Sequence, residues 1–223
     1  CARFDSTDQT LKKYSRKYRI DFLKHENVNS TEFISRIANY KCDLLVSMSF
    51  NQIFKKKIIN LTKYKIINCH AGKLPFYRGR NVLNWALIND EKEFGITVHF
   101  VDEKIDTGNI ILQRTFSISD RDNYNTLLKK AYTGCANILF DSVILFKKGN
   151  PKSFSQKKIH LVGSYCPIRK VGDEIINWNQ TSREIFNFVR AICIPGPIAR
   201  SFINKIEMKI NKVEYVRETK KHK

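Results

Sequence analysis

The longest periodic segment of this chain, residues 122–148, strongly limits what the sequence can fold into. Its apolar side chains recur every three or four positions, and two lysines at its end are followed by Gly149 and Pro151. That period is typical of an amphipathic α-helix, and the cationic last turn, glycine and proline are typical of a helix end. A helix of this length needs a broad apolar surface to pack on, so the sequence predicts a helix lying on a β-sheet.

Extended and helical segments alternate along the rest of the first 150 residues. Apolar runs bounded by polar residues indicate buried strands, and β-branched alternation indicates a half-buried strand. By these criteria strands are expected at residues 43–49, 65–69, 95–101 and 110–116, and helices at residues 8–18, 81–89 and from Asn29, which stands at capping-box spacing from Glu32. Strands alternating with helices predict a three-layer α/β core with a mostly parallel, Rossmann-like sheet.

The sequence changes character after Pro151. We predict a catalytic core over residues 1–150, and a linker, a helix and a small β-rich region over residues 151–223. Thr181 and Glu184 have capping-box spacing and mark the start of that helix. Two strands are expected beyond it, at residues 199–203 and 207–215.

Composition favours a soluble, cytoplasmic protein. The six cysteines are scattered without a CxxC pair, and neither a disulfide framework nor a metal site is expected. No apolar run approaches the length of a membrane span. The formal charge of +19 leaves two interpretations open, namely a solvated basic surface or attraction of a phosphate-bearing substrate such as tRNA.

Three polar residues near the middle of the chain suggest acyl chemistry. Asn68 and His70 end a predicted strand, and Asp106 lies in the turn after the following strand. An amide can stabilise a developing oxyanion, an imidazole can move a proton, and a carboxylate can orient the imidazole. Each residue alone is more often structural, and His99 on the next strand is interpreted as structural too.

The motifs around these residues resemble one enzyme family. They are Asn-Cys-His at 68–70, Leu-Pro-Phe-Tyr-Arg-Gly at 74–79 and Ile-Asp-Thr-Gly at 105–108. Together they resemble the folate-dependent formyltransferases. Arg80, Asn81 and Trp85 make the chain more similar to the nucleotide-sugar N-formyltransferases than to the tRNA or purine enzymes.

The resemblance implies roles for individual residues. Asn68 would stabilise the oxyanion, His70 would stabilise the intermediate or shuttle a proton, and Asp106 would orient His70 and help deprotonate the amine. The donor would be N10-formyltetrahydrofolate, without a metal. Its expected contacts are Phe50, Asn51, Gln52, Ile53, Phe54, Asp102, Glu103, Lys104 and Ile105, and the expected acceptor contacts are Tyr77, Arg78, Arg80 and Trp85. Core packing is the alternative for Phe50, Ile53 and Trp85, and a purely structural role is the alternative for Arg78.

The resemblance also implies partners. The expected acceptor is an amino sugar carried by a nucleotide diphosphate, with methionyl-tRNA as the first alternative. Hydrolysis of formyltetrahydrofolate and non-catalytic folate binding are further alternatives. A homodimer through residues 206–216 is expected, and the family's opening strand–helix unit is expected to be absent from the sequence.

Overall fold

A computed structural model describes residues 1–216, so the end of the predicted second region, residues 217–223, lies outside the described residues. Its central sheet has the strand order β1 (Leu45–Met48), β2 (Ile66–His70), β4 (Glu93–Phe100) and β5 (Ile110–Ser117). β1 and β2 are parallel, whereas β4 is antiparallel to both β2 and β5. Three of these four strands therefore point the same way, which confirms the predicted α/β fold with a mostly parallel sheet.

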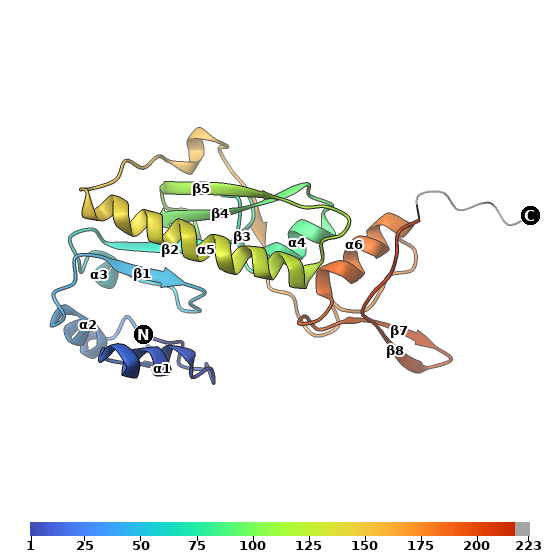
Figure 1. Cartoon of the computed structure of the whole chain (residues 1–223), viewed down its shortest axis with the longest axis horizontal. Helices are drawn as coiled ribbons and strands as arrows, with labels where there is room; N and C mark the ends of the chain where they lie inside the picture. Colours follow the sequence, from blue (N-terminus) through green and yellow to red (C-terminus); the bar gives the residue numbers. More distant parts are fainter. Residues whose placement is uncertain (217–223) are drawn as a thin grey trace, which may run out of the picture.

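Helices cover both faces of this sheet (Figure 1). Along β2, Ile66 packs in a cluster with residues of α2 (Thr31–Ala38) and α3 (Lys56–Ile59), while Ile67 and Cys69 pack in the larger cluster on the other face. This division follows from the strand period, because successive side chains point to opposite faces. The chain thus forms the three layers that the sequence predicts.

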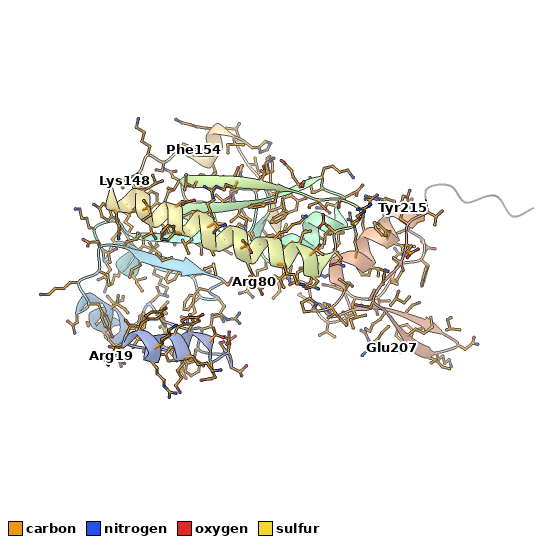
Figure 2. The ribbon with its side chains drawn as sticks, in the orientation of Figure 1. Arg19, Arg80, Lys148, Phe154, Glu207 and Tyr215 are labelled. Atoms are coloured by element: carbon orange, nitrogen blue, oxygen red, sulfur yellow. The ribbon has the colours of Figure 1, made fainter. Side chains whose placement is uncertain are left out.

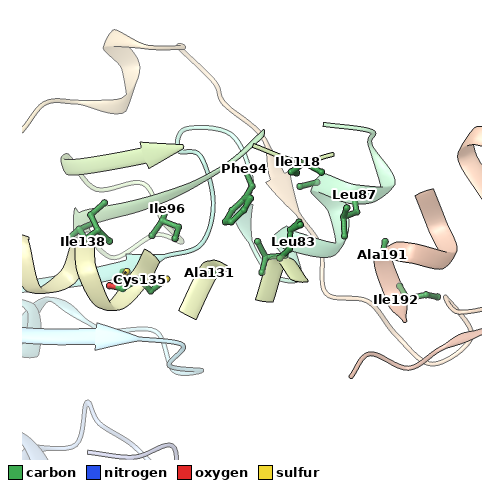
Figure 3. Close-up of a cluster of buried hydrophobic side chains, with 14 of the residues drawn as sticks. Leu83, Leu87, Phe94, Ile96, Ile118, Ala131, Cys135, Ile138, Ala191 and Ile192 are labelled. Carbon is green, nitrogen blue, oxygen red and sulfur yellow. Dashed lines mark hydrogen bonds between the residues drawn. The ribbon is translucent and has the colours of Figure 1, made fainter. Parts of the chain in front are cut away.

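The long predicted helix is α5 (Tyr124–Lys147), which lies across the larger core cluster. Asn123 caps it through a reciprocal capping box with Thr126. Figure 3 shows Cys135 and Ile138 of this helix beside Ile96 of β4. At Gly134 a Cβ atom would lie 2.5 Å from Ile96 Cδ1, so a glycine lets the helix approach the sheet closely.

Two helix starts differ from the prediction. α1 (Thr10–Tyr18) begins two residues later than expected. The N-cap of α2 is Ser30, not Asn29, because the Ser30 hydroxyl accepts the hydrogen bond from the Phe33 amide. The Asn29 side chain instead binds the backbone of Ile53 and Lys55, and capping by an adjacent residue leaves it free to do so.

The segment after β2 forms a loop and then α4 (Val82–Ile88). The linker after α5 returns to this loop and pairs with it. β3 (Arg78–Gly79) pairs with β6 (Tyr165–Cys166), which follows the short helix η1 (Gln156–Lys158). Two-residue strands have no detectable sequence period, so this pairing was not predicted. It joins the loop after His70 to a segment almost ninety residues later in the chain.

The carboxyl-terminal elements are α6 (Ser182–Ile192), β7 (Ala199–Ile203) and β8 (Ile206–Ile210). The capping box of Thr181 and Glu184 is present, as predicted. β7 and β8 form an antiparallel hairpin, but β8 ends at Ile210 and not at residue 215. None of the helices in residues 1–216 combines the length and apolar character that crossing a membrane would require.

Candidate active site

Asn68 and His70 lie two positions apart on β2, so their side chains share one face of the strand. The loop between β4 and β5 brings Asp106 against both of them. The Asp106 carboxylate lies 3.7 Å from His70 Nδ1 and 3.5 Å from Asn68 Nδ2. The Gly79 amide donates a hydrogen bond to the same carboxylate at 2.9 Å. The structure therefore gathers the three residues that the sequence singles out.

His99 is a fourth member of this cluster that the sequence interpretation left as structural. It is almost fully buried, and its Nε2 atom lies 3.3 Å from Asn68 Nδ2 and 3.4 Å from Asp106 Oδ1. β4 runs antiparallel to β2 with His99 directly opposite Asn68. The strand predicted at residues 95–101 contains His99, but only the register between β2 and β4 shows that His99 lies beside Asn68.

The surroundings of His70 favour its neutral form. Burial lowers the pKa of this imidazole, although the nearby Asp106 charge and the contact with Tyr77 raise it in part. His70 Nε2 lies 2.6 Å from the Tyr77 carbonyl oxygen, which can only accept, so the Nε2 proton donates to it. The neutral ring then carries its lone pair on Nδ1, which faces Asp106.

Asp106 is held ionised in spite of its burial. Burial by itself raises the pKa of the carboxyl group, but its electrostatic interactions with His99 and His70 and the hydrogen bond from the Gly79 amide together lower it to about 2. A charged carboxylate thus lies beside a neutral imidazole that has a free lone pair. This pair can accept a proton on His70 Nδ1 and stabilise the resulting cation.

A cleft of about 690 Å³ opens beside these side chains, within the size range of small-molecule sites. The loop after β1 and the loop after β4 both line it. The predicted donor contacts that line the cleft are Phe50, Asn51, Gln52, Ile53, Phe54, Asp102, Lys104, Ile105, whereas Glu103 lines a separate cavity of about 590 Å³.

The donor side of the cleft offers apolar side chains and backbone groups. Ile53 and Ile105 are 58% and 41% exposed, although both are large aliphatic residues. Two polar side chains nearby are already engaged, since Gln52 bonds to Val28 and His25, and Asp102 accepts from Thr107. This part of the cleft therefore offers an exposed aliphatic surface against which a flat ring can pack.

The predicted acceptor contacts separate into two groups. Arg80 is exposed and lines the cleft (labelled in Figure 2). Tyr77 and Trp85 line a neighbouring pocket of about 490 Å³, where Tyr77 donates to Glu91 and Trp85 donates to the Pro167 carbonyl. The Arg78 guanidinium is directed to Gln156 and to the Val162 carbonyl.

Arg169 is a further cation in the lining of the cleft that the sequence interpretation did not select. Its guanidinium carbon lies 5.6 Å from the Trp85 ring and 5.5 Å from the Phe188 ring. Its Nε atom is buried and has no hydrogen-bond partner among the described residues. No sequence motif distinguishes this arginine, because its two aromatic neighbours come from α4 and α6.

Comparisons with known proteins show the family to which the chain belongs. The formyl transferase family matches residues 4–143, and the formyl transferase carboxyl-terminal domain matches residues 169–223. The methionyl-tRNA formyltransferase of Fusobacterium nucleatum is 36% identical over 200 residues, which cover 90% of this chain and 64% of that relative. The chain therefore spans slightly less than two thirds of this relative's length.

Two solved structures share both the fold and part of the sequence. WlaRD, a sugar 3N-formyl transferase studied in the presence of dTDP and 5-N-formyl-THF, has a TM-score of 0.70 and 26% identity, covering 96% of this chain and 73% of its own. An N-formyltransferase from Helicobacter canadensis, in complex with folinic acid and dTDP-3-aminofucose, has a TM-score of 0.66 and 26% identity, covering 90% of this chain and 70% of its own. This chain belongs to the formyl transferase family.

Proposed function

We propose that this protein transfers a formyl group from N10-formyltetrahydrofolate to a primary amine. The observation that carries this proposal is the cluster of Asn68, His70 and ionised Asp106 in the wall of a cleft with an apolar side. The donor would supply an activated formyl carbon. The loop at residues 50–54 and the turn at residues 102–106 would hold its ring system between Ile53 and Ile105.

Each polar side chain has a separate role in this proposal. The two N–H donors of the Asn68 amide face Asp106 Oδ1 at 3.5 Å and His99 Nε2 at 3.3 Å, and one of them would turn to the formyl oxygen as negative charge develops there. A neutral amine attacks the formyl carbon, and His70 Nδ1 takes the proton from the nitrogen that has become cationic. Asp106 stabilises the imidazolium from 3.7 Å. The imidazolium then gives this proton to N10 of the folate as the bond between the formyl carbon and N10 breaks and tetrahydrofolate leaves.

Methionyl-tRNA is the acceptor that the comparisons favour first. The relative with 36% identity carries that name, and a net charge of +19 suits a polyanionic partner. The nucleotide-linked amino sugar that the sequence motifs favoured is the second candidate. It is supported by the two sugar N-formyltransferases of similar fold at 26% identity.

Both candidate acceptors carry phosphate, and two arginines are placed to bind it. Arg80 is exposed at the cleft, and Arg169 is half-buried in its lining. We expect Arg80→Gln and Arg169→Gln each to raise the acceptor KM by about 10-fold, since a hydrogen bond to a charged group contributes roughly 1.5–3 kcal/mol. Arg121→Gln, an exposed change just before α5, is the matched control and leaves the acceptor KM unchanged.

A three-arm assay tests the proposed function. N10-formyltetrahydrofolate is mixed with methionyl-tRNA, with a panel of dTDP-, UDP- and GDP-linked amino sugars, or with buffer, and formyl adducts are detected by mass. An adduct in either acceptor arm that is lost in Asn68→Ala, His70→Ala and Asp106→Ala supports the function and identifies the acceptor. Donor breakdown in buffer alone indicates a hydrolase. Donor binding without turnover in any arm indicates a binding protein.

The homodimer through residues 206–216 and the cytoplasmic location stay predictions. Ile206 at the start of β8 is 70% exposed, which is compatible with a covered surface in a dimer.

A further inference from the structure

Gln156 is a buried polar residue that the proposed chemistry does not use. It begins η1, and its side chain is only 2% exposed. Its amide nitrogen donates to the Asp106 carbonyl at 2.7 Å and to the Gly108 carbonyl at 2.8 Å. Its amide oxygen accepts from Arg78 Nε at 3.1 Å and from Arg78 Nη2 at 2.7 Å. All four hydrogen-bonding positions of this side chain are therefore occupied.

The partners of Gln156 allow only one orientation of its amide. Two carbonyl oxygens face the nitrogen, and two guanidinium N–H groups face the oxygen. A rotation by 180° would place donors against donors and acceptors against acceptors, at a cost typical of several buried unpaired polar groups. The Gln156 amide therefore has one favourable orientation, and in that orientation it joins Arg78 to the Asp106 turn.

These contacts close a ring around the carboxylate. Arg78 precedes Gly79, and the Gly79 amide donates to Asp106 Oδ2 at 2.9 Å. The Asp106 backbone carbonyl in turn accepts a hydrogen bond from the Gln156 side chain. Asp106 also has a φ of +53°, a left-handed conformation that is uncommon for residues other than glycine. Such a conformation persists where the surroundings hold it, and here both the backbone and the side chain of Asp106 are held.

We propose that Gln156 is a positioning residue that sets the direction of the Asp106 carboxylate toward His70 and Asn68. The inference rests on the proposed function, because it concerns the carboxylate assigned to His70. Gln156 does not line the cleft. It acts through the Asp106 turn and through Arg78. In this arrangement Arg78 and Gly79 hold Asp106 in place and do not bind the acceptor.

Two variants separate the two halves of this arrangement. Gln156→Met has similar length and removes all four hydrogen bonds. Gln156→Glu keeps an acceptor for Arg78 but turns a carboxylate oxygen toward two carbonyls. We expect both to lower kcat by about 10²-fold, the typical effect of an ångström-scale displacement of a reacting group, with the donor KM within about twofold of wild type. Asn187→Leu is the matched control, because Asn187 is equally buried and its oxygen also accepts from an arginine, Arg190.

The readout that isolates positioning from stability is the pKa of His70, measured by NMR titration of its imidazole. The Asp106 charge raises that pKa in the wild type, so a carboxylate that turns away lowers it. We expect a lower His70 pKa in Gln156→Met and no change in Asn187→Leu, although both lose thermal stability. If Gln156→Met does not fold, the kcat of Gln156→Glu decides the question.

The outcomes distinguish the inference from the proposed function. The positioning role alone would be overturned if Asp106→Asn is inactive but Gln156→Glu keeps the wild-type kcat. It would also be overturned if Asp106→Asn is inactive while folded Gln156→Met keeps both the wild-type kcat and the wild-type His70 pKa. Full activity of Asp106→Asn would overturn the proposed function itself. A loss of kcat in Asn187→Leu equal to that in Gln156→Met would show that any buried lesion has this effect, and would also overturn the inference.

Discussion

Hydrogen bonds to backbone carbonyls fix which ring nitrogen carries the proton in each neutral imidazole of the site. His70 Nε2 faces the Tyr77 carbonyl, and His99 Nδ1 faces the Phe100 carbonyl at 2.7 Å. Since a carbonyl only accepts, each ring has its proton on that side when neutral. The second nitrogen of each ring is then turned toward Asp106. In both rings the carbonyl contact therefore fixes the orientation of the imidazole relative to Asp106.

The first prediction concerns the acidic side of the pH–rate profile. Burial lowers the pKa of His70, so the imidazole is neutral at pH 7 and its Nδ1 atom can accept a proton. Activity is then lost as the pH falls through a value below the ordinary histidine pKa of about 6.5. Asp106 raises the His70 pKa, so residual activity in Asp106→Asn should decline only at lower pH. The profile of kcat/KM against pH checks this, and an unshifted acidic limb contradicts it.

A second prediction concerns the space around His70. A Cβ atom at Gly72 would lie 2.4 Å from both His70 Nε2 and the Tyr77 oxygen. Gly72→Ala must therefore separate these two atoms or displace the ring. We expect a fall in kcat of about 10²-fold at unchanged donor affinity, measured by steady-state kinetics and by titration calorimetry. At Gly149 an added Cβ meets no atom within 4 Å, although its φ of +135° strains an alanine at the end of α5. Gly149→Ala should therefore keep wild-type kcat even if it loses stability, and equal losses of kcat in both variants would refute the argument.

At the level of elements, the start of α2 supports the donor side of the cleft. Asn29 Nδ2 donates to the Ile53 carbonyl at 2.9 Å, and Asn29 Oδ1 accepts from the Lys55 amide at 2.7 Å. One side chain thus holds the loop between β1 and α3 from both directions. The adjacent Ser30 has a different task, since it caps α2.

The third prediction uses these two neighbours as a matched pair. Asn29→Ala frees the loop at residues 50–55 and should raise the donor KM by about 5-fold, equivalent to roughly 1 kcal/mol for a lost hydrogen bond. Ser30→Ala should instead lower the unfolding free energy by about 1 kcal/mol, as expected for a lost N-cap, at unchanged donor KM. Donor titration and thermal unfolding of both variants measure this. A donor KM that responds equally to both changes would mean that Asn29 acts only through helix stability.

Helices and strands that carry a periodic apolar pattern or a cap in their own sequence could be predicted. Elements too short to carry such a pattern could not. α5 and α6 carry an apolar period and a cap in sequence, and both were found. The pairing of β3 with β6 involves two residues on each side and depends on where the linker returns. The predicted start of α2 was wrong by one residue. Asn29 and Ser30 are both good N-cap residues, but the Asn29 side chain binds the Ile53 carbonyl and Ser30 caps the helix.

For the whole molecule, the net charge of +19 separates the two candidate acceptors. Binding of a nucleic acid by cationic side chains releases counterions, so its affinity falls steeply with salt. If methionyl-tRNA is the acceptor, its KM should rise by about tenfold or more between 50 and 200 mM salt. The donor KM is the internal control and should change little. A flat acceptor KM over this range would argue for the small nucleotide sugar instead.

Local sequence determined the four strands of the central sheet, the long helix and the residue types of the candidate site, because periodicity, caps and the identities of Asn68, His70 and Asp106 are properties of short segments. It also determined that Asn68 and His70 share a face, since they stand two apart on one strand. Only the tertiary structure decided that His99 and Gln156 join Asp106. Those contacts depend on the β2–β4 register and on the return of the linker, which arise from packing between distant segments. The same packing turned Arg78 toward Gln156 and left Arg80 and Arg169 at the cleft.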